Sequence, residues 1–234
     1  MEDFDVAALA AYLHITPDQV YKLIKQEKLP ARRVGGEFRF SEAEIHHWLE
    51  DRIGVSDDNQ LQKVEAALHR SAPAHPVWSI AEFCSVDRIA VPLTSRTRGS
   101  AIRDMCQLAT HGGLMWDAQA MAEAVLARED LHPTALDNGV AMLHPRRPQS
   151  SILADSVIAL GIAPQPLAFA GGGQLTDVFF LICSYDDAIH LRILARLSRM
   201  ITIPEWLDRL RASSSPAEAH ALIREAEEPL LDKG

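Results

Sequence analysis

The chain has 234 residues, of which 47% are hydrophobic and 24% are charged, and its formal net charge is −9 at pH 7. This composition is typical of a globular protein and excludes long disorder, collagen and a coiled-coil rod. The length suffices for one large domain or two small ones. No unbroken apolar run approaches the roughly 20 residues needed to cross a bilayer, so we expect no membrane partner.

Targeting and cysteine patterns favour the cytoplasm. The first five residues, Met1 to Asp5, are acidic, whereas a secretory signal needs basic residues followed by an apolar stretch. Cys84, Cys106 and Cys183 are odd in number and far apart, and none has CxxC or Cys/His ligand spacing. We therefore expect a cytoplasmic protein with reduced cysteines, no disulfide, no zinc and no other cofactor.

Two short helices are predicted at the start of the chain. Apolar residues recur at helical spacing between Val6 and Leu13, which predicts an amphipathic helix over residues 5–13. Thr16-Pro17-Asp18-Gln19 then forms a capping box with proline at the first helical position, so a second helix begins there. Leu29-Pro30 ends it, and its outward face is polar and mostly basic.

A hairpin and a third helix complete this small unit. Residues 32–40 alternate around Gly35-Gly36, which is a strong hairpin signal. Ser41-Glu42-Ala43-Glu44 is a second capping box, and it opens a helix whose Ile45, Trp48 and Leu49 can cover the core. The segment from Val20 to Phe40 holds six basic and two acidic residues, so positive charge is concentrated there although the whole chain is acidic.

In this order the motifs resemble the winged helix-turn-helix of the excisionase and MerR-like class. The resemblance implies a recognition helix from Pro17 to Lys28 in the major groove and a wing from Arg32 to Phe40 against the DNA backbone. The residues that carry it are Leu9-Ala10-Ala11-Tyr12-Leu13, Val20-Tyr21-Lys22-Leu23-Ile24, Leu29-Pro30-Ala31, Arg33-Val34-Gly35-Gly36, Phe38-Arg39-Phe40 and Ile45, Trp48 and Leu49.

The candidate DNA-binding residues follow from their positions on these elements. For any single residue among them, a solvated surface charge is an equally good interpretation. One such domain binds DNA weakly, so a homodimer on paired half-sites is a reasonable expectation. The candidates are Gln19, Tyr21, Lys22 and Lys25 for the groove and Arg32, Arg33 and Arg39 for the phosphates.

The remaining chain predicts an α/β domain behind a linker. Residues 57–70 have the pattern of a helix, and the breaker-rich residues 71–76 follow as a stiff joint. We therefore divide the chain into residues 1–54, a helical linker over 55–76, and residues 77–234. Short apolar strands then alternate with helices, which indicates a sheet with helices on its faces. Strands are expected at 89–93, 138–144, 156–161 and 178–184, and helices at 98–109, 118–128, 186–201 and from the cap at 215 to 228.

One histidine in this part follows an apolar run. The strand-like run over residues 138–143 leads directly to His144, and Arg146 and Arg147 follow after Pro145. A neutral imidazole is a competent nucleophile near pH 7, and arginine forks can hold phosphate oxygens. Taken alone, the run also fits a surface loop with a stray histidine.

Residues 77–231 resemble the IIA domain of the phosphoenolpyruvate-dependent sugar phosphotransferase system, in its fructose, mannitol and nitrogen-regulatory class. The resemblance implies a mixed sheet flanked by helices, with His144 accepting a phosphoryl group from a histidine phosphocarrier protein (HPr-like). It further implies that His190 lies against His144, that Arg128 is near the phosphate, and that Thr134 and Arg146 help to bind it. Its carriers are Arg128-Glu129, Thr134, Asn138-Gly139-Val140-Ala141, His144, Arg146, Pro166-Leu167-Ala168-Phe169, residues 178–182, His190-Leu191 and Leu194-Ala195-Arg196-Leu197.

Together the two resemblances predict a DNA-binding regulator that couples phosphotransfer status to transcription. Two alternatives remain. In the first, the chain is a phosphocarrier, that is, a phosphohistidine phosphotransferase component whose small domain serves as a locator. In the second, it is a IIA-like interaction scaffold that accepts no phosphate. The scaffold is motivated by Leu143-His144-Pro145, where family members commonly read Pro-His-Gly, because proline offers no backbone N–H.

Overall fold

The computed structural model describes residues 3–12, 16–25, 29–41, 44–45, 48, 78–170 and 175–231. Three predictions lie wholly or partly outside these ranges: the helical linker over 55–76, the last turn of the recognition helix at 26–28, and most of the third helix of the small unit. The described residues fall into an N-terminal part, up to Trp48, and a C-terminal part, from Trp78.

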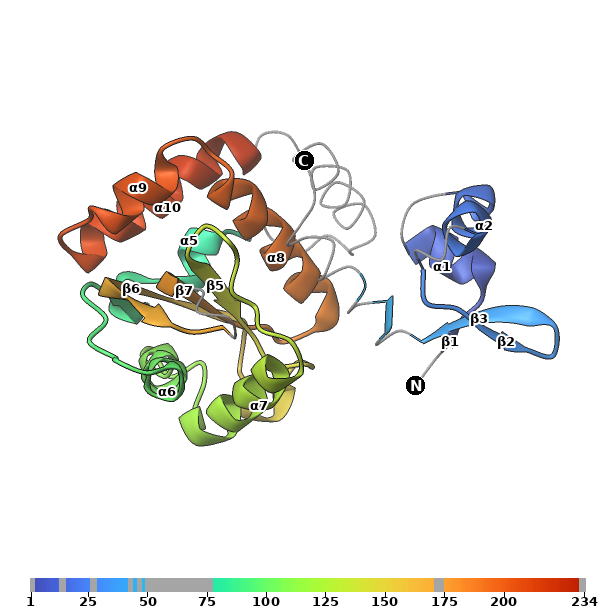
Figure 1. Ribbon diagram of the computed structural model, residues 1–234, viewed down its shortest axis with the longest axis horizontal. Helices are drawn as coiled ribbons and strands as arrows, with labels where there is room; N and C mark the ends of the chain where they lie inside the picture. The colour runs from blue at the N-terminus through green and yellow to red at the C-terminus, as the bar shows by residue number, and fades with distance from the viewer. Residues whose placement is uncertain are drawn as a thin grey trace.

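The N-terminal part contains the predicted pair of helices and the predicted hairpin. The helices are α1 (Val6–Tyr12) and α2 (Pro17–Lys25), and the hairpin strands are β2 (Arg32–Val34) and β3 (Glu37–Ser41). A strand that the sequence did not indicate, β1 (Asp3–Phe4), pairs antiparallel with β3 and gives the sheet order β1-β3-β2. Figure 1 shows the two helices beside this small sheet.

Local signals explain these elements. The predicted capping box of α2 forms, because the backbone N–H of Gln19 donates to Thr16 Oγ1 and the side chain of Gln19 accepts from the Thr16 N–H at 2.8 Å. Gly35 and Gly36 have φ of 61° and 88°, which is the backbone that a two-residue hairpin turn requires. Six apolar residues, at most 5% exposed, form the core: Leu9, Ala10, Val20, Leu29, Phe40 and Ile45.

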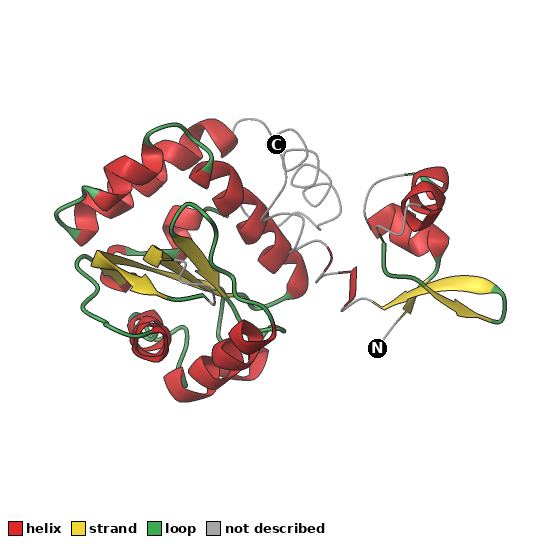
Figure 2. Cartoon of the chain, in the orientation of Figure 1, coloured by secondary structure: helices red, strands yellow, loops and turns green. Residues whose placement is uncertain are grey.

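The C-terminal part is a mixed sheet between two layers of helices (Figures 1 and 2). Its strand order is β4-β6-β7-β5, in which β6 and β7 are antiparallel and the two outer pairs are parallel. The elements in chain order are α5 (Ile80–Phe83), η1 (Val86–Arg88), β4 (Ile89–Ala90), α6 (Arg98–Ala109), α7 (Ala118–Leu131), β5 (Val140–Leu143), η2 (Ser150–Ile152), β6 (Val157–Ala168), β7 (Leu175–Cys183), α8 (Asp187–Ile201), α9 (Trp206–Arg211) and α10 (Pro216–Leu231).

The strands alternate their side chains between the two helical layers. On β5, Val140 and Met142 pack with α8 and α10, whereas Ala141 and Leu143 pack with α6 and α7. Because both faces of the sheet are covered, its strands are continuous apolar runs, as expected for a buried sheet. Among the described residues, no helix is long and apolar enough to cross a membrane.

Several element boundaries differ from the sequence prediction. Strand β6 continues through Gly161 to Ala168, since that glycine provides close packing: a Cβ there would lie 2.6 Å from Met105 Sδ. The strand expected at 89–93 is assigned only at Ile89–Ala90. Helix α7 ends at Leu131, three residues beyond the predicted end, and the short helices α5 and α9 were not predicted.

Candidate functional site

Two histidines meet where two neighbouring parallel strands end. His144 directly follows β5, and Ser184 directly follows β7 and leads into α8. Asp186 caps α8 by accepting the backbone N–H of Ile189 at 2.9 Å, which fixes the first turn that carries His190. The ring centroids of His144 and His190 are 5.0 Å apart, with an angle of 56° between the ring planes. Both side chains are buried, at 3% and 5% exposure.

The hydrogen bonds of the pair decide which nitrogen can react. His144 Nδ1 lies 2.8 Å from the carbonyl oxygen of Met142, which can only accept, so Nδ1 carries the proton. In the neutral ring the lone pair of His144 is therefore on Nε2. His190 Nδ1 lies 3.0 Å from Ser184 Oγ, a hydroxyl that can donate or accept.

Arg128 and Thr134 lie at and just beyond the end of α7. Arg128 is buried in the last turn, and its Nη1 donates to the carbonyl of His132 at 2.7 Å. The neighbouring Glu129 accepts the hydroxyl and the backbone N–H of Thr134, the latter at 3.1 Å. The Thr134 carbonyl in turn accepts the Met142 N–H at 3.4 Å, so this loop adjoins the strand that carries His144.

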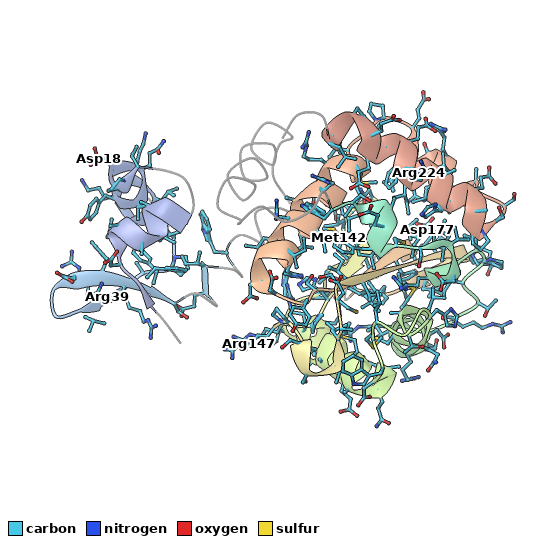
Figure 3. The ribbon with its side chains drawn as sticks, turned by 180° about the vertical axis from the view of Figure 1, so that it is seen from behind. Asp18, Arg39, Met142, Arg147, Asp177 and Arg224 are labelled. Atoms are coloured by element: carbon cyan, nitrogen blue, oxygen red, sulfur yellow. The ribbon has the colours of Figure 1, made fainter. Side chains whose placement is uncertain are left out.

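The arginines after His144 lie at the surface. Arg146 and Arg147 are exposed, while Pro145, which lies between His144 and Arg146, is buried. Figure 3 shows Met142 inside the domain and Arg147 extending outward from it. The structure thus brings the rings of His144 and His190 into contact. The Thr134 carbonyl is bonded to Met142, in the strand that leads to His144, and Arg146 lies in the exposed loop after that strand.

Three site residues were assigned no function from the sequence. Ser184 holds the ring of His190, the Met142 carbonyl selects the tautomer of His144, and Glu129 orders Thr134. A hydroxyl residue at the end of a predicted strand was the available signal for Ser184. No sequence signal marks a backbone carbonyl two residues before a histidine.

Other nucleophiles and metal ligands contribute no competing site in the described ranges. Burial raises the pKa of the Cys84 and Cys106 thiols to about 12, and burial also raises the pKa of Cys183, so the three buried thiols stay protonated near neutral pH. Among the residues whose placement is described, no cluster of three His, Cys, Asp or Glu side chains could hold a metal ion.

The candidate groove residues lie on α2. Tyr21, Lys22 and Lys25 are exposed on this helix, with Tyr21 at 44%. Gln19 is exposed as well, but its side-chain oxygen is already bonded to the start of the helix through the Thr16 N–H. The exposed amine and phenol groups are therefore better placed than Gln19 to meet a ligand.

The three candidate phosphate contacts on the wing differ in their surroundings. Arg32 and Arg33 are exposed, and the Arg33 guanidinium lies 4.8 Å from the centroid of the Phe38 ring. The Tyr21 ring meets the same phenylalanine edge-on at 6.1 Å, so Phe38 joins the wing to α2. Arg39 instead pairs with Glu37 at 3.0 Å and lies 4.0 Å from Asp5 (Figure 3).

Comparison with known proteins identifies two regions. Residues 82–226 match the family described as "Phosphoenolpyruvate-dependent sugar phosphotransferase system, EIIA 2", and residues 4–53 match the family described as "Helix-turn-helix domain". The chain is 30% identical to the nitrogen regulatory protein of Klebsiella oxytoca over 115 residues, which cover 47% of this chain and 68% of that protein.

Two solved structures share the fold. Nitrogen regulatory protein IIA-Ntr from Neisseria meningitidis aligns with a TM-score of 0.55 at 20% identity and covers 62% of this chain and 98% of its own. Enzyme IIAMTL from Escherichia coli, in complex with phosphorylated enzyme IIBMTL, aligns with a TM-score of 0.52 at 18% identity and covers 60% of this chain and 96% of its own. The chain therefore belongs to the EIIA 2 family of the sugar phosphotransferase system, and a helix-turn-helix domain precedes its EIIA domain.

Proposed function

We propose that this chain is a DNA-binding regulator whose EIIA domain accepts a phosphoryl group on His144 from a histidine phosphocarrier and couples phosphotransfer status to transcription. The observation that carries the proposal is the buried imidazole pair. His144 donates through Nδ1 to the Met142 carbonyl, its lone pair is thereby on Nε2, and the ring of His190 lies against it. Family membership supports the same chemistry.

The proposed transfer exchanges one P–N bond for another. The lone pair on Nε2 of His144 attacks the phosphorus of the carrier's phosphohistidine, and a P–N bond forms. The P–N bond of the carrier breaks, and its electron pair returns to the carrier's ring nitrogen, so no redox partner is needed. His144 keeps its proton on Nδ1, where it is hydrogen-bonded to the Met142 carbonyl. This proton offsets part of the negative charge of the phosphoryl group.

The other site residues receive supporting roles in this proposal. His190, held by Ser184, orients the acceptor ring and stabilises the phosphoryl oxygens. Arg128 ends α7 and Thr134 lies in the loop that follows beside β5, and Arg146 supplies an exposed guanidinium for a phosphate or a docked partner. The solved complex of enzyme IIAMTL with phosphorylated enzyme IIBMTL supports a protein as the phosphoryl-exchange partner.

For the output we propose DNA binding by the helix-turn-helix domain, within boundaries of 1–54, a linker over 55–76 and the EIIA domain over 77–234. The exposed basic surface of α2 and β2 supports a phosphate-contacting face. A homodimer would pair two such faces on half-sites. The residues assigned are Gln19, Tyr21, Lys22, Lys25, Arg32, Arg33 and Arg39.

A specific observation favours one other function, a scaffold that accepts no phosphate. Pro145 is buried directly after His144 and offers no backbone N–H to a phosphoryl oxygen. His144 itself is 3% exposed, so a donor reaches it only if the surrounding side chains yield. In a scaffold the histidine pair would be a structural contact, and the protein would signal by binding partners alone.

Phosphotransfer to the pure full chain tests both functions. The chain is incubated with labelled phosphoenolpyruvate, Enzyme I and a histidine phosphocarrier, and acid-labile phosphate is counted. We expect the wild type to be labelled, His144→Ala to be unlabelled, and His190→Gln to be labelled roughly 100-fold more slowly, because misplacing a reacting group costs about that factor.

His132→Ala is the matched control, since His132 is exposed and its bonds with Arg128 are made by its backbone, which the substitution keeps. It should be labelled like the wild type. An unlabelled wild type beside a labelled IIA control would overturn the proposal in favour of the scaffold. Rapid and complete discharge to a IIB partner, with DNA binding unaffected, would favour the phosphocarrier.

A further inference from the structure

The first described residue of the EIIA domain packs against two arginines of α8. Trp78 is buried, and its ring centroid lies 4.0 Å from the guanidinium carbon of Arg196 and 5.4 Å from that of Arg192. The ring of Phe83 stacks on it at 6.2 Å. Guanidinium groups over an indole face are attracted by the ring quadrupole, most strongly when water is excluded. Helix α8 therefore holds the point at which the chain enters the EIIA domain.

A buried ion pair secures the same segment from a second helix. Glu227 of α10 pairs with Arg196 at 3.1 Å, with side-chain exposures of 2% and 3%. The carboxylate also accepts the backbone N–H groups of Ile80 at 2.6 Å and Ala81 at 3.1 Å, which open α5. A carboxylate at a helix start is favoured by the helix dipole and by the unsatisfied N–H groups there.

Helix α8 also contacts the strand that leads to His144, on either side of Arg192 and Arg196 in sequence. His190 in the first turn lies against His144. Two turns later, Ser198 Oγ lies 4.0 Å from Met142 Sδ, and the carbonyl of that methionine holds His144 Nδ1. All side chains from residue 190 to residue 200 are buried. A helix packed on every side moves as a unit, since close-packed interiors do not deform continuously.

We infer that α8 mechanically couples the His144–His190 pair to Trp78, with Arg192 and Arg196 as the positioning residues that join them. The helix thereby connects the acceptor site to the start of the EIIA domain, which the chain enters after the helix-turn-helix domain. The coupling takes its regulatory meaning from the proposed function, in which His144 carries phosphate. A phosphoryl group would place one to two negative charges beside the N-terminal end of α8, where the helix dipole attracts them.

The coupling is reciprocal, so it can be measured from the tryptophan end in the unphosphorylated full chain. We would record the imidazole nitrogen resonances of His144 and His190 in the wild type, Trp78→Phe and Trp206→Phe. Trp206 is the matched control, because it is also buried but bonds to the Leu222 carbonyl through Nε1 at 3.0 Å, between α9 and α10. Assignments come from His144→Ala and His190→Ala.

We expect Trp78→Phe to shift the resonances of both histidines, whereas Trp206→Phe leaves them at the wild-type positions. Arg196→Lys keeps the charge that faces Glu227 but loses the flat guanidinium over Trp78, so it should shift them as well. Superimposable imidazole spectra of Trp78→Phe and the wild type would overturn the coupling, whatever the protein's phosphorylation competence.

Hydrogen exchange tests the forward direction. In chain labelled by the phosphotransfer reaction, we expect the amides of Ile80 and Ala81 to change their exchange rates by about 5-fold or more, as couplings of 1–3 kcal/mol produce. His144→Ala under the same conditions should show no change. Labelled wild type with unchanged exchange would overturn the inference and leave the proposed function standing. Absent label would instead contradict the proposed function, while the imidazole spectra still decide the coupling.

Discussion

The described arginines of the two parts have different environments. In the EIIA domain five are at most 6% exposed, namely Arg88, Arg128, Arg192, Arg196 and Arg199, and the bonds of Arg88, Arg128 and Arg196 go to carbonyls or carboxylates inside the domain. On the wing, Arg32 and Arg33 are exposed and Arg39 is 33% exposed. Burying a guanidinium is costly unless it is paired, so a buried one holds the fold together and an exposed one is placed to meet a ligand.

This difference makes the environment of an arginine more informative than its position in a motif. Arg128 matches a family position near the phosphate, yet its Nη1 bonds the His132 carbonyl. Arg39 matches a wing position, yet Glu37 neutralises it. We therefore expect an arginine that is paired inside the domain to affect folding most, and an exposed arginine without an acidic partner to affect binding most.

The fully buried pair should show the largest effect on folding. Glu227→Gln leaves Arg196 with an uncompensated buried charge and weakens the cap on α5, so we expect a loss of about 3–5 kcal/mol in the free energy of unfolding. Urea unfolding followed by tryptophan fluorescence measures it.

Glu225→Gln on the same helix α10 is the matched control. Glu225 forms a bidentate pair with Arg209 at 2.6 and 2.7 Å, but at the surface, where solvent screens it. Its urea midpoint should stay close to that of the wild type. Equal midpoints for Glu227→Gln and Glu225→Gln would break the distinction between buried and exposed arginines.

A partly buried pair should rank second. Arg211 forms a bidentate pair with Asp177 at 2.8 and 3.0 Å and also donates to the Asn138 carbonyl. We expect Asp177→Asn to cost about 1.5–3 kcal/mol, the usual range for hydrogen bonds to a charged group. Asp208→Asn removes the other partner of Arg211, which lies at 3.5 Å and is 83% exposed, and should change the urea midpoint far less. The reverse order would contradict the ranking.

The exposed wing should affect DNA binding with little effect on folding. Removing Arg33 removes a cation without a described acidic partner, so Arg33→Ala should lower the affinity for duplex DNA and reduce the salt slope by about 1. Arg39→Ala should do less, because Glu37 already offsets that charge. Fluorescence anisotropy at several salt concentrations measures both.

Glu37→Gln sharpens the wing comparison, since it frees Arg39 from its acidic neighbour and should raise the affinity for DNA. Equal losses for Arg33→Ala and Arg39→Ala, together with no gain for Glu37→Gln, would show that the ion pair does not matter for binding.

Periodicity and capping signals predicted most of the fold. Helix α6 has the predicted bounds, and Asp117 and Asp186 cap α7 and α8 as helix starts. The signals failed where tertiary packing decides the bounds of an element. Gly161 ends the strand predicted over 156–161, but in the structure β6 continues through it to Ala168. The two-residue strand β1 has no periodicity at all and exists only through its pairing with β3.

Local sequence patterns indicated candidate residues for the site but not the contacts between them. Only the family resemblance put His144 beside His190, because nothing local relates residues that far apart in sequence. The partners Ser184, the Met142 carbonyl and Glu129 depend on strand register and loop path. Arg196 packs on Trp78 and pairs with Glu227, which joins residues from the beginning, middle and end of the EIIA domain that no motif spans.

The most direct test of the account is the affinity of the full chain for DNA before and after phosphotransfer. Duplexes selected by the chain from a random pool would be titrated with the wild type and His144→Ala, each with and without phosphoenolpyruvate, Enzyme I and the phosphocarrier. The account predicts that phosphotransfer changes the wild-type Kd by about 5-fold or more in one direction and leaves that of His144→Ala unchanged. A fully labelled wild type that binds with an unchanged Kd would contradict the coupling of phosphotransfer to transcription.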